Sequence, residues 1–184
     1  AEDGIRDYKV TGVQTCALPI SFQAGGAFGR FQNLLFDFPC HDLHLTIPDF
    51  HHTRKRFARL QEAIAKDEHN RAAEAKAEIE FALKQEPMVD VLLNAHARGE
   101  IPERVTHNDT KFNNVMLDAA TGEAMCVVDL DTVMPGLVLY DFGDMVRTTT
   151  SRTAEDEVFL ERVELEMPLL DRKSTRLNSS HLVI

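Results

Sequence analysis

The polar run at residues 107–114 (HNDTKFNN) holds the side chains whose types and spacing best fit a reaction. His107, Asp109 and Asn114 follow the spacing H-x-D-x-x-x-x-N, which is typical of catalytic loops in phosphoryl-transfer enzymes. In such a loop the aspartate orients the attacking hydroxyl and accepts its proton, while the asparagine binds magnesium. Lys111 could offset charge on the transferred phosphoryl group. Because His, Asp and Asn are also common in ordinary turns, this loop needs support from a second feature.

Two aspartates farther along the chain supply that support. Asp129 and Asp131 follow the apolar pair Val127 and Val128, where a strand is expected to end. A carboxylate at that point can reach across a hairpin to a metal shared with Asn114. Magnesium prefers oxygen ligands and fills its remaining positions with water and substrate phosphates. The sequence therefore predicts three candidate metal ligands, with direct contact by the last left open: Asn114, Asp129 and Asp131.

Two other functions are compatible with part of this pattern. Asp129-Leu130-Asp131 spells D-x-D, which holds a metal and a nucleotide sugar in glycosyltransferases, but this interpretation leaves His107, Asp109 and Asn114 without roles. An inactive pseudokinase that serves as a binding module is disfavoured because every catalytic-loop position is intact.

Two further motifs are interpreted as structural. Asp141-Phe142-Gly143 spells the DFG of protein kinases, but it lies beyond a second loop, so we expect Asp141 to cap a helix from about Phe142 to Thr148. The glycines within residues 25–29 lack the G-x-G-x-x-G spacing of a phosphate-binding loop, and close helix packing is the simpler interpretation.

The elements that position these residues change character along the chain. The first half predicts a helix from about Phe22, with an apolar stripe at Phe28, Phe31, Leu35 and Phe38. Further helical segments are expected from Thr53 as an N-cap, over residues 71–83, and between Pro87 and Gly99.

The second half predicts a β-hairpin. Apolar runs at residues 115–117 and 125–128 flank a turn at residues 118–122. Cys126 is expected to be a small core residue of this hairpin. Farther on, one helix face is predicted from the spacing of Phe159, Val163 and Met167.

Composition narrows the class of protein. The chain has 184 residues, and its 30 acidic and 20 basic side chains give a formal net charge of −10. This balance argues against a nucleic-acid partner or an anionic membrane surface. No apolar run approaches the roughly 18 residues needed to cross a bilayer. Three dispersed cysteines without a CxxC pair favour a reducing, cytoplasmic location.

Both ends of the chain read as translated sequencing adapter. Residues 171–181 match an in-frame translation of a common adapter, and residues 10–20 match the translation of its reverse complement. Such segments are set aside before a fold is inferred. We therefore expect residues 21–170 to be the biological sequence, and an artefact of adapter origin at residues 1–20 and 171–184.

The sequence resembles a known group of enzymes. Residues 104–118 (RVTHNDTKFNNVMLD) and 127–148 (VVDLDTVMPGLVLYDFGDMVRT) resemble the C-terminal lobe of the aminoglycoside phosphotransferase and choline kinase superfamily. Within it, the chain is most similar to bacterial N-acetylhexosamine 1-kinases, with residues 47–57 (IPDFHHTRKRF) as a supporting match.

The resemblance implies an α+β fold: a fragment of the mainly helical C-terminal lobe of a protein-kinase-like fold, with a short catalytic β-hairpin. It implies ATP and Mg²⁺ as cofactors, Asp109 as the catalytic base, and Asn114 and Asp129 as metal ligands. His107 would orient the loop. The implied reaction is phosphorylation of the anomeric hydroxyl of an N-acetylhexosamine or related sugar. Aminoglycoside, choline and homoserine kinases share the loop and are alternatives.

Kinases of this type also use an N-terminal ATP-binding lobe with a strand-borne lysine. We expect that lobe to be absent from this chain, because no residue before Ser21 can supply it. Residues 21–170 would then be a partial C-terminal lobe, and the isolated chain is expected to be inactive.

Overall fold

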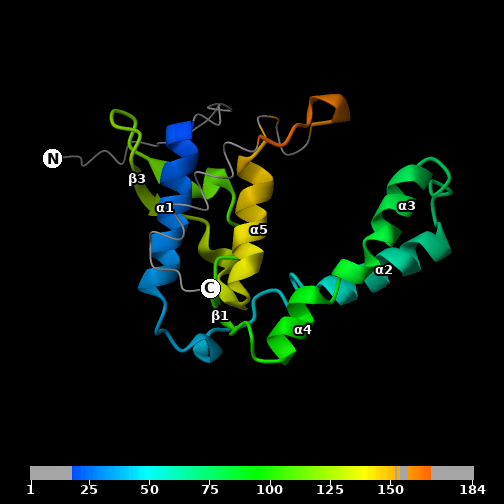
Figure 1. Ribbon diagram of the computed structural model, residues 1–184, viewed down its shortest axis with the longest axis horizontal. Coiled ribbons are helices and arrows are strands. Elements are labelled where there is room, and N and C mark those ends of the chain that lie inside the picture. Colours follow the sequence, from blue (N-terminus) through cyan, green and yellow to red (C-terminus); the bar gives the residue numbers. More distant parts are fainter. Residues whose placement is uncertain (1–17, 152, 154–156, 167–184) are drawn as a thin grey trace. The chain divides into compact units, whose positions relative to one another are not determined.

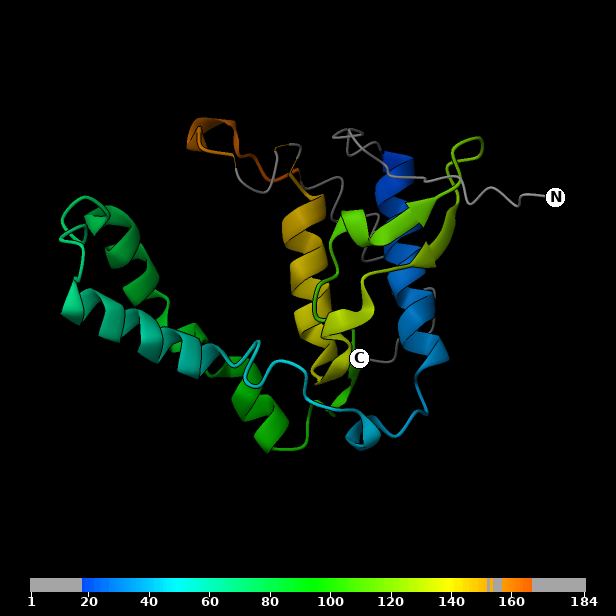
Figure 2. The same cartoon turned by 180° about the vertical axis from the view of Figure 1, so that it is seen from behind.

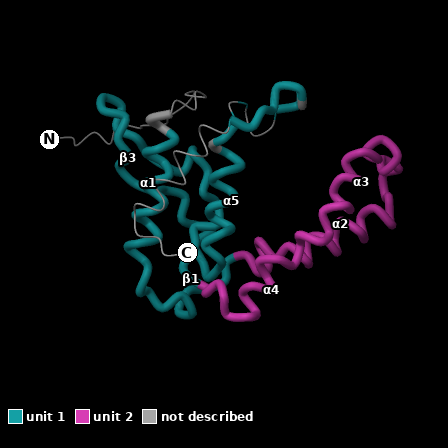
Figure 3. The backbone as a smooth tube through the Cα atoms, viewed as in Figure 1, with its two compact units in different colours: residues 1–46, 104–184 teal, residues 47–103 magenta. Residues whose placement is uncertain are grey.

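The chain forms helices and short antiparallel strands, an α+β arrangement, in the computed structural model (Figure 1). The structure describes residues 18–151, 153 and 157–166. It divides into two compact units, which are described separately: unit 1 contains residues 1–46 and 104–184, and unit 2 contains residues 47–103 (Figure 3). No helix in the described part of the chain is both long and apolar enough to span a membrane.

The predicted hairpin is present in unit 1. β2 (Val115–Leu117) pairs antiparallel with β3 (Ala124–Val127), and Val115 lies opposite Val127. In the connecting turn, the Asp118 carbonyl accepts a hydrogen bond from the Gly122 amide at 2.8 Å. Gly122 has a φ of 72°, which glycine adopts without steric cost. The local sequence signals for strands and turn are therefore confirmed.

A second strand pair in unit 1 was not predicted. β1 (Arg104–Thr106) pairs antiparallel with β4 (Met134–Gly136), so that Val105 lies opposite Pro135. Three-residue strands are too short to show a reliable alternation of polar and apolar residues. β1 ends at Thr106, so the polar run that begins at His107 follows this strand directly.

Two helices pack on the strands of unit 1. α1 (Leu18–Leu34) packs on β3, and α5 (Val138–Thr149) contacts β1. In both views the hairpin of β2 and β3 lies against α1 (Figures 1 and 2). The buried core cluster is formed by Ala24, Ala27, Phe28, Val115, Leu117 and Met145.

α1 differs in extent from the predicted helix. It begins at Leu18 rather than near Phe22, and it ends at Leu34. Of the predicted stripe, Phe28 is buried, whereas Phe38 lies beyond the helix and is exposed. The glycines at positions 25, 26 and 29 are buried within α1, which agrees with close packing rather than a phosphate-binding loop.

Unit 2 is helical. It contains α2 (Thr53–Lys66), α3 (Lys76–Lys84) and α4 (Val91–Ala97). The N-cap of α2 is His52 rather than Thr53, because His52 Nδ1 accepts a hydrogen bond from the Lys55 amide at 3.4 Å. The predicted third helix is shorter than expected, since residues 71–75 lie in turns.

Two other expectations are wrong. Cys126 is exposed, because β3 turns this side chain away from the core cluster. The predicted helix face near the C-terminus is replaced by one short 3₁₀ turn, Leu160–Arg162. Phe159 and Val163 are each 49% exposed, and Met167 lies outside the described residues, as do residues 1–17 and 171–184.

Candidate functional site

The catalytic loop, defined here as residues 107–114, begins with a sharp change of direction after β1. Asn108 adopts a left-handed conformation with a φ of 65°. Its side-chain nitrogen Nδ2 donates to the Thr132 carbonyl at 3.0 Å, and its Oδ1 accepts from Thr106 Oγ1 at 3.0 Å. Asparagine tolerates this conformation better than most residues, because its short side chain bonds locally. This left-handed residue changes the direction of the backbone between the end of β1 and Asp109.

Three of the predicted site residues meet in this loop. Asp109 Oδ1 lies 3.1 Å from Lys111 Nζ, and Asp109 Oδ2 accepts a hydrogen bond from Asn114 Nδ2 at 3.1 Å. The Asp109 side chain is 22% exposed. Each ionised carboxylate oxygen has two lone pairs, so each keeps one available after these contacts. The carboxylate is thus held in place and can still accept a proton.

The Asn114 side chain has a defined orientation. Nδ2 donates to both Asp109 Oδ2 and the Asp109 carbonyl, the latter at 2.8 Å. Because both partners are acceptors, the nitrogen must face Asp109. The oxygen Oδ1 is therefore the atom that remains for a metal or a water.

The predicted carboxylate ligands Asp129 and Asp131 lie on the acidic turn, defined here as residues 128–132. The Val128 amide donates to the Asn114 carbonyl at 2.9 Å, and the Val128 carbonyl accepts from His107 Nε2 at 3.0 Å. These bonds bring the backbone next to Asp129 against the catalytic loop. Asp129 has a φ of 62°.

The two carboxylates of the acidic turn are themselves exposed. No hydrogen bond or ion pair joins the side chain of Asp129 or Asp131 to another described residue. The described part of the chain also has no group of three or more His, Cys, Asp or Glu residues that could hold a metal. The structure thus joins the two backbone segments and leaves the Asp129 and Asp131 carboxylates open to solvent.

His107 is fully buried behind the loop. Its ring makes edge contacts with Phe28 and Phe31, at centroid distances of 5.4 and 5.6 Å. Since its Nε2 faces a carbonyl, which can only accept, Nε2 carries the hydrogen. The other nitrogen, Nδ1, has no partner within the described residues. These contacts fit a residue that orients the loop rather than one that touches substrate.

Asp141 has a different structural role from the one predicted. α5 begins at Val138 with Leu137 as its N-cap, so Asp141 lies inside the first turn and does not cap the helix. Its buried carboxylate instead accepts hydrogen bonds from the backbone amides of His107 and Asn108, at 2.9 and 2.7 Å. Burial raises the pKa of Asp141, while these amide bonds act in the opposite direction. Asp141 therefore ties α5 to the catalytic loop.

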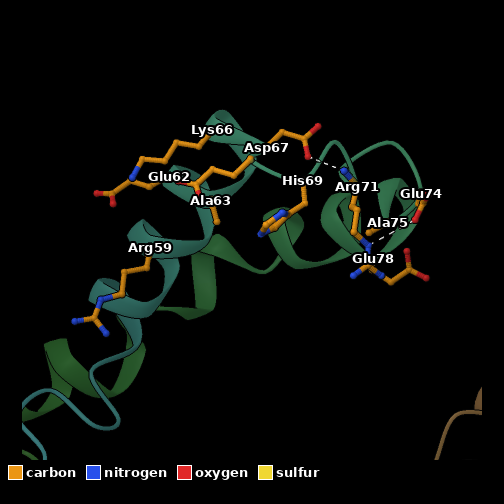
Figure 4. A pocket seen from close by; sticks show the side chains of 11 residues that line it. Arg59, Glu62, Ala63, Lys66, Asp67, His69, Arg71, Glu74, Ala75 and Glu78 are labelled. Carbon is orange, nitrogen blue, oxygen red and sulfur yellow. Dashed lines mark hydrogen bonds and ion pairs between the residues drawn. The ribbon is translucent and has the colours of Figure 1, made fainter.

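A hollow of about 640 Å³ lies elsewhere, in unit 2, between the end of α2 and the start of α3 (Figure 4). Its charged lining residues interact with one another: the Arg71 amide donates to the Asp67 carboxylate at 2.8 Å, and Arg71 Nε lies 3.7 Å from Glu74. None of the predicted site residues lines it. Size alone therefore does not make this hollow the functional site.

The family was established by comparison with models of known protein families. Residues 19–172 match the model of the phosphotransferase enzyme family. The chain belongs to this family. The matched region of the phosphotransferase includes both the catalytic loop and the acidic turn. This membership favours phosphoryl transfer over the D-x-D glycosyltransferase alternative.

Three residues that no sequence motif indicated also contact the candidate site or the segments next to it. Gln32 Nε2 donates to the Asp141 carboxylate at 2.6 Å. Thr132 Oγ1 donates to the His107 carbonyl at 2.7 Å. At Gly136, an added Cβ would lie only 2.3 Å from Thr106 Oγ1. No local motif marks these positions, because each acts on a segment distant in sequence.

Proposed function

We propose that this phosphotransferase moves the γ-phosphoryl group of ATP to a hydroxyl group of a small molecule, with Asp109 as the catalytic base. The observation that carries the proposal is the hydrogen-bonded group of Asp109, Lys111 and Asn114 within one loop. Phosphoryl transfer requires mainly alignment and charge compensation, which such a group can provide.

The donor atoms fit Mg²⁺. Asn114 presents a neutral oxygen, because its nitrogen is engaged by Asp109. Asp129 presents an exposed carboxylate next to the Val128 backbone that bonds to Asn114. Mg²⁺ in phosphate-processing sites commonly takes one or two carboxylates, with waters and substrate phosphates completing its shell. When bound, the ion would neutralise charge on the phosphates, and Asn114 and Asp129 would hold it, with Asp131 as a further candidate ligand.

The remaining roles follow from the same contacts. Asp109 would orient the acceptor hydroxyl and take its proton through the carboxylate lone pairs that Lys111 and Asn114 leave unused. Lys111, whose Nζ lies 3.1 Å from Asp109 Oδ1, would place a positive charge beside the transferred group. His107 would act only through the position of the loop.

The narrower part of the proposal concerns the acceptor. We propose the anomeric hydroxyl of an N-acetylhexosamine or a related sugar. The support is the resemblance of residues 47–57 and 127–148 to bacterial N-acetylhexosamine 1-kinases. Rates of phosphate transfer to N-acetylhexosamines, aminoglycosides, choline and homoserine would separate these alternatives.

The binding test uses the full 184-residue chain. Mn²⁺, a paramagnetic substitute for Mg²⁺, should broaden the amide signals of Asn114 and Asp129 first, while those of the hairpin turn at residues 118–122 remain sharp. Asp129→Asn should weaken Mn²⁺ binding, whereas the matched control Asp42→Asn, an exposed acid on the 3₁₀ turn Cys40–Asp42, should not. Broadening centred elsewhere would refute the metal site.

We expect catalysis to need the N-terminal ATP-binding lobe, so it is tested in a protein that includes that lobe. There, Asp109→Asn should lower the rate of ATP-dependent transfer by about 10²- to 10⁴-fold, since general-base catalysis contributes that much. The Tm should stay close to that of the unchanged chain, because Asn keeps the side-chain shape. The rate is measured by ³¹P NMR of the product. If the Asp109→Asn protein transferred phosphate as fast as the same protein with Asp109, the assignment of the base would be overturned.

A further inference from the structure

The acidic turn is attached to the catalytic loop at both of its ends. At the first end, Val128 accepts a hydrogen bond from His107 Nε2 and donates one to the Asn114 carbonyl. At the second end, Thr132 makes two hydrogen bonds to the beginning of the loop. The residues between these ends include both candidate carboxylate ligands, Asp129 and Asp131.

The contacts of Thr132 are reciprocal. Its hydroxyl donates to the His107 carbonyl at 2.7 Å, and its own carbonyl accepts from Asn108 Nδ2 at 3.0 Å. His107 and Asn108 directly precede Asp109. A single residue of the acidic turn therefore holds the two residues that set the direction of the catalytic base.

The turn needs such external support. Asp129 has φ 62° and ψ 60°, a left-handed conformation that residues with a Cβ adopt rarely. Its side chain makes no capping hydrogen bond that would stabilise this conformation locally. Inside the turn, residues 130–132 form a single 3₁₀ turn, in which the Val133 amide donates to the Leu130 carbonyl at 3.1 Å. The hydrogen bonds that attach this turn to the catalytic loop are at Val128 and Thr132.

We infer that Thr132 is a positioning residue, which acts through His107 and Asn108 to present the base and the metal ligands together. Its hydroxyl and carbonyl contact His107 and Asn108. The inference rests on the proposed function, because it assigns the ligands of the acidic turn to the same metal as Asn114. The side-chain hydroxyl, rather than the bulk of the residue, carries the role.

The experiment compares two substitutions at this position. Thr132→Val keeps the β-branched shape and removes the hydroxyl, whereas Thr132→Ser keeps the hydroxyl. Thr121→Val is the matched control, because its hydroxyl bonds to Asp118 in the hairpin turn and is not part of the site. Mn²⁺ affinity is measured by electron paramagnetic resonance, and hydrogen exchange of the Val128 amide is measured by NMR without metal.

Thr132→Val should weaken Mn²⁺ binding by about 10-fold, in the range seen when partners of metal ligands are removed. Thr132→Ser should restore the affinity, and Thr121→Val should leave it unchanged. The Val128 amide should exchange faster in Thr132→Val only. Wild-type affinity in Thr132→Val would overturn the inference, as would a loss in Thr132→Ser equal to that in Thr132→Val.

Failure of the proposed function would look different. If the unchanged chain bound no Mn²⁺, the metal site would be refuted. Exchange of the Val128 amide would still test whether the Thr132 hydroxyl holds the acidic turn against the catalytic loop. Faster exchange in Thr132→Val with recovery in Thr132→Ser supports this role, and equal protection in all variants overturns it.

Discussion

Asp141 shows how a single buried carboxylate can organise a loop that is distant in sequence. Its two oxygens accept hydrogen bonds from two consecutive loop amides and from Gln32, and its backbone carbonyl accepts from Thr110 Oγ1 at 2.5 Å. The amide partners favour the ionised form of Asp141, while burial disfavours it. Burial is the larger effect, so the pKa is raised.

This raised pKa predicts the pH dependence of stability. A folded state that holds the Asp141 proton more tightly than the unfolded state is favoured at low pH. The Asp141 contribution to the free energy of unfolding should therefore be greatest below the ordinary pKa of 3.8, and should fall as pH rises through the raised value. Urea denaturation across this range measures it.

The control for this prediction is Asp141→Asn, which cannot titrate. It should be less stable than the unchanged chain, because its NH₂ group would face hydrogen-bond donors. The difference in free energy of unfolding between the two proteins should narrow with increasing pH, since contributions from all other groups cancel. A difference that widens with increasing pH would mean that the amide hydrogen bonds lower the pKa of Asp141 by more than burial raises it.

At the scale of elements, the pairing of β1 with β4 depends on a close approach at Gly136. Gly136 lies opposite Arg104 in the pair, and its Cα hydrogen faces Thr106 and Asn108. An added Cβ would lie 2.3 Å from Thr106 Oγ1 and 3.1 Å from Asn108 Oδ1. Thr106 cannot move freely, because its hydroxyl also bonds to the Met134 carbonyl at 3.0 Å.

Gly136→Ala should consequently destabilise the protein by about 1–3 kcal/mol, the usual cost of overpacking a tight site. Gly143→Ala is the matched control, because Gly143 lies on the exposed side of α5 with no atom within 4 Å of an added Cβ. In a helix interior this change should stabilise by about 0.5–1 kcal/mol. Equal free energies of unfolding for the two variants, measured in urea, would contradict the close approach.

At the scale of the whole molecule, the two units differ in how much apolar surface they bury. Nine of the ten buried hydrophobic residues of the described chain lie in unit 1, and Phe57 alone lies in unit 2. Among the polar contacts of unit 2, the Arg54 guanidinium bonds to Asp90 and Glu86. These groups are partly exposed, and such pairs contribute little in salt.

Hydrogen exchange should reflect this difference. Regions with few buried apolar contacts open at lower free energy, so amides of α2, α3 and α4 should exchange faster than those of β2 and α5. Mass spectrometry of peptides from the two units measures the rates. Equal protection in both units would show that unit 2 is stabilised by contacts other than those described.

Local features of the site were predictable from the sequence. The spacing of Asp109 and Asn114 places both on one loop, and the hairpin strands were located within one or two residues. Both depend on contacts between near neighbours in the chain, which leave signals in residue type and spacing. The positions of helix ends were less well predicted, as at His52 and Leu34, because capping depends on the local backbone geometry rather than on residue type alone.

What the sequence determined by itself was the family of the chain, the set of candidate site residues and most of the local elements that carry them. Only the tertiary structure decided how they are held: Asp141 as an anchor of the loop, Gln32 and Thr132 as its partners, and the exposure of Cys126. Gln32 and Asp141 are 109 positions apart. Contacts over such separations arise when packed elements bring distant segments together, and they leave no periodic pattern in one sequence from which they could be predicted.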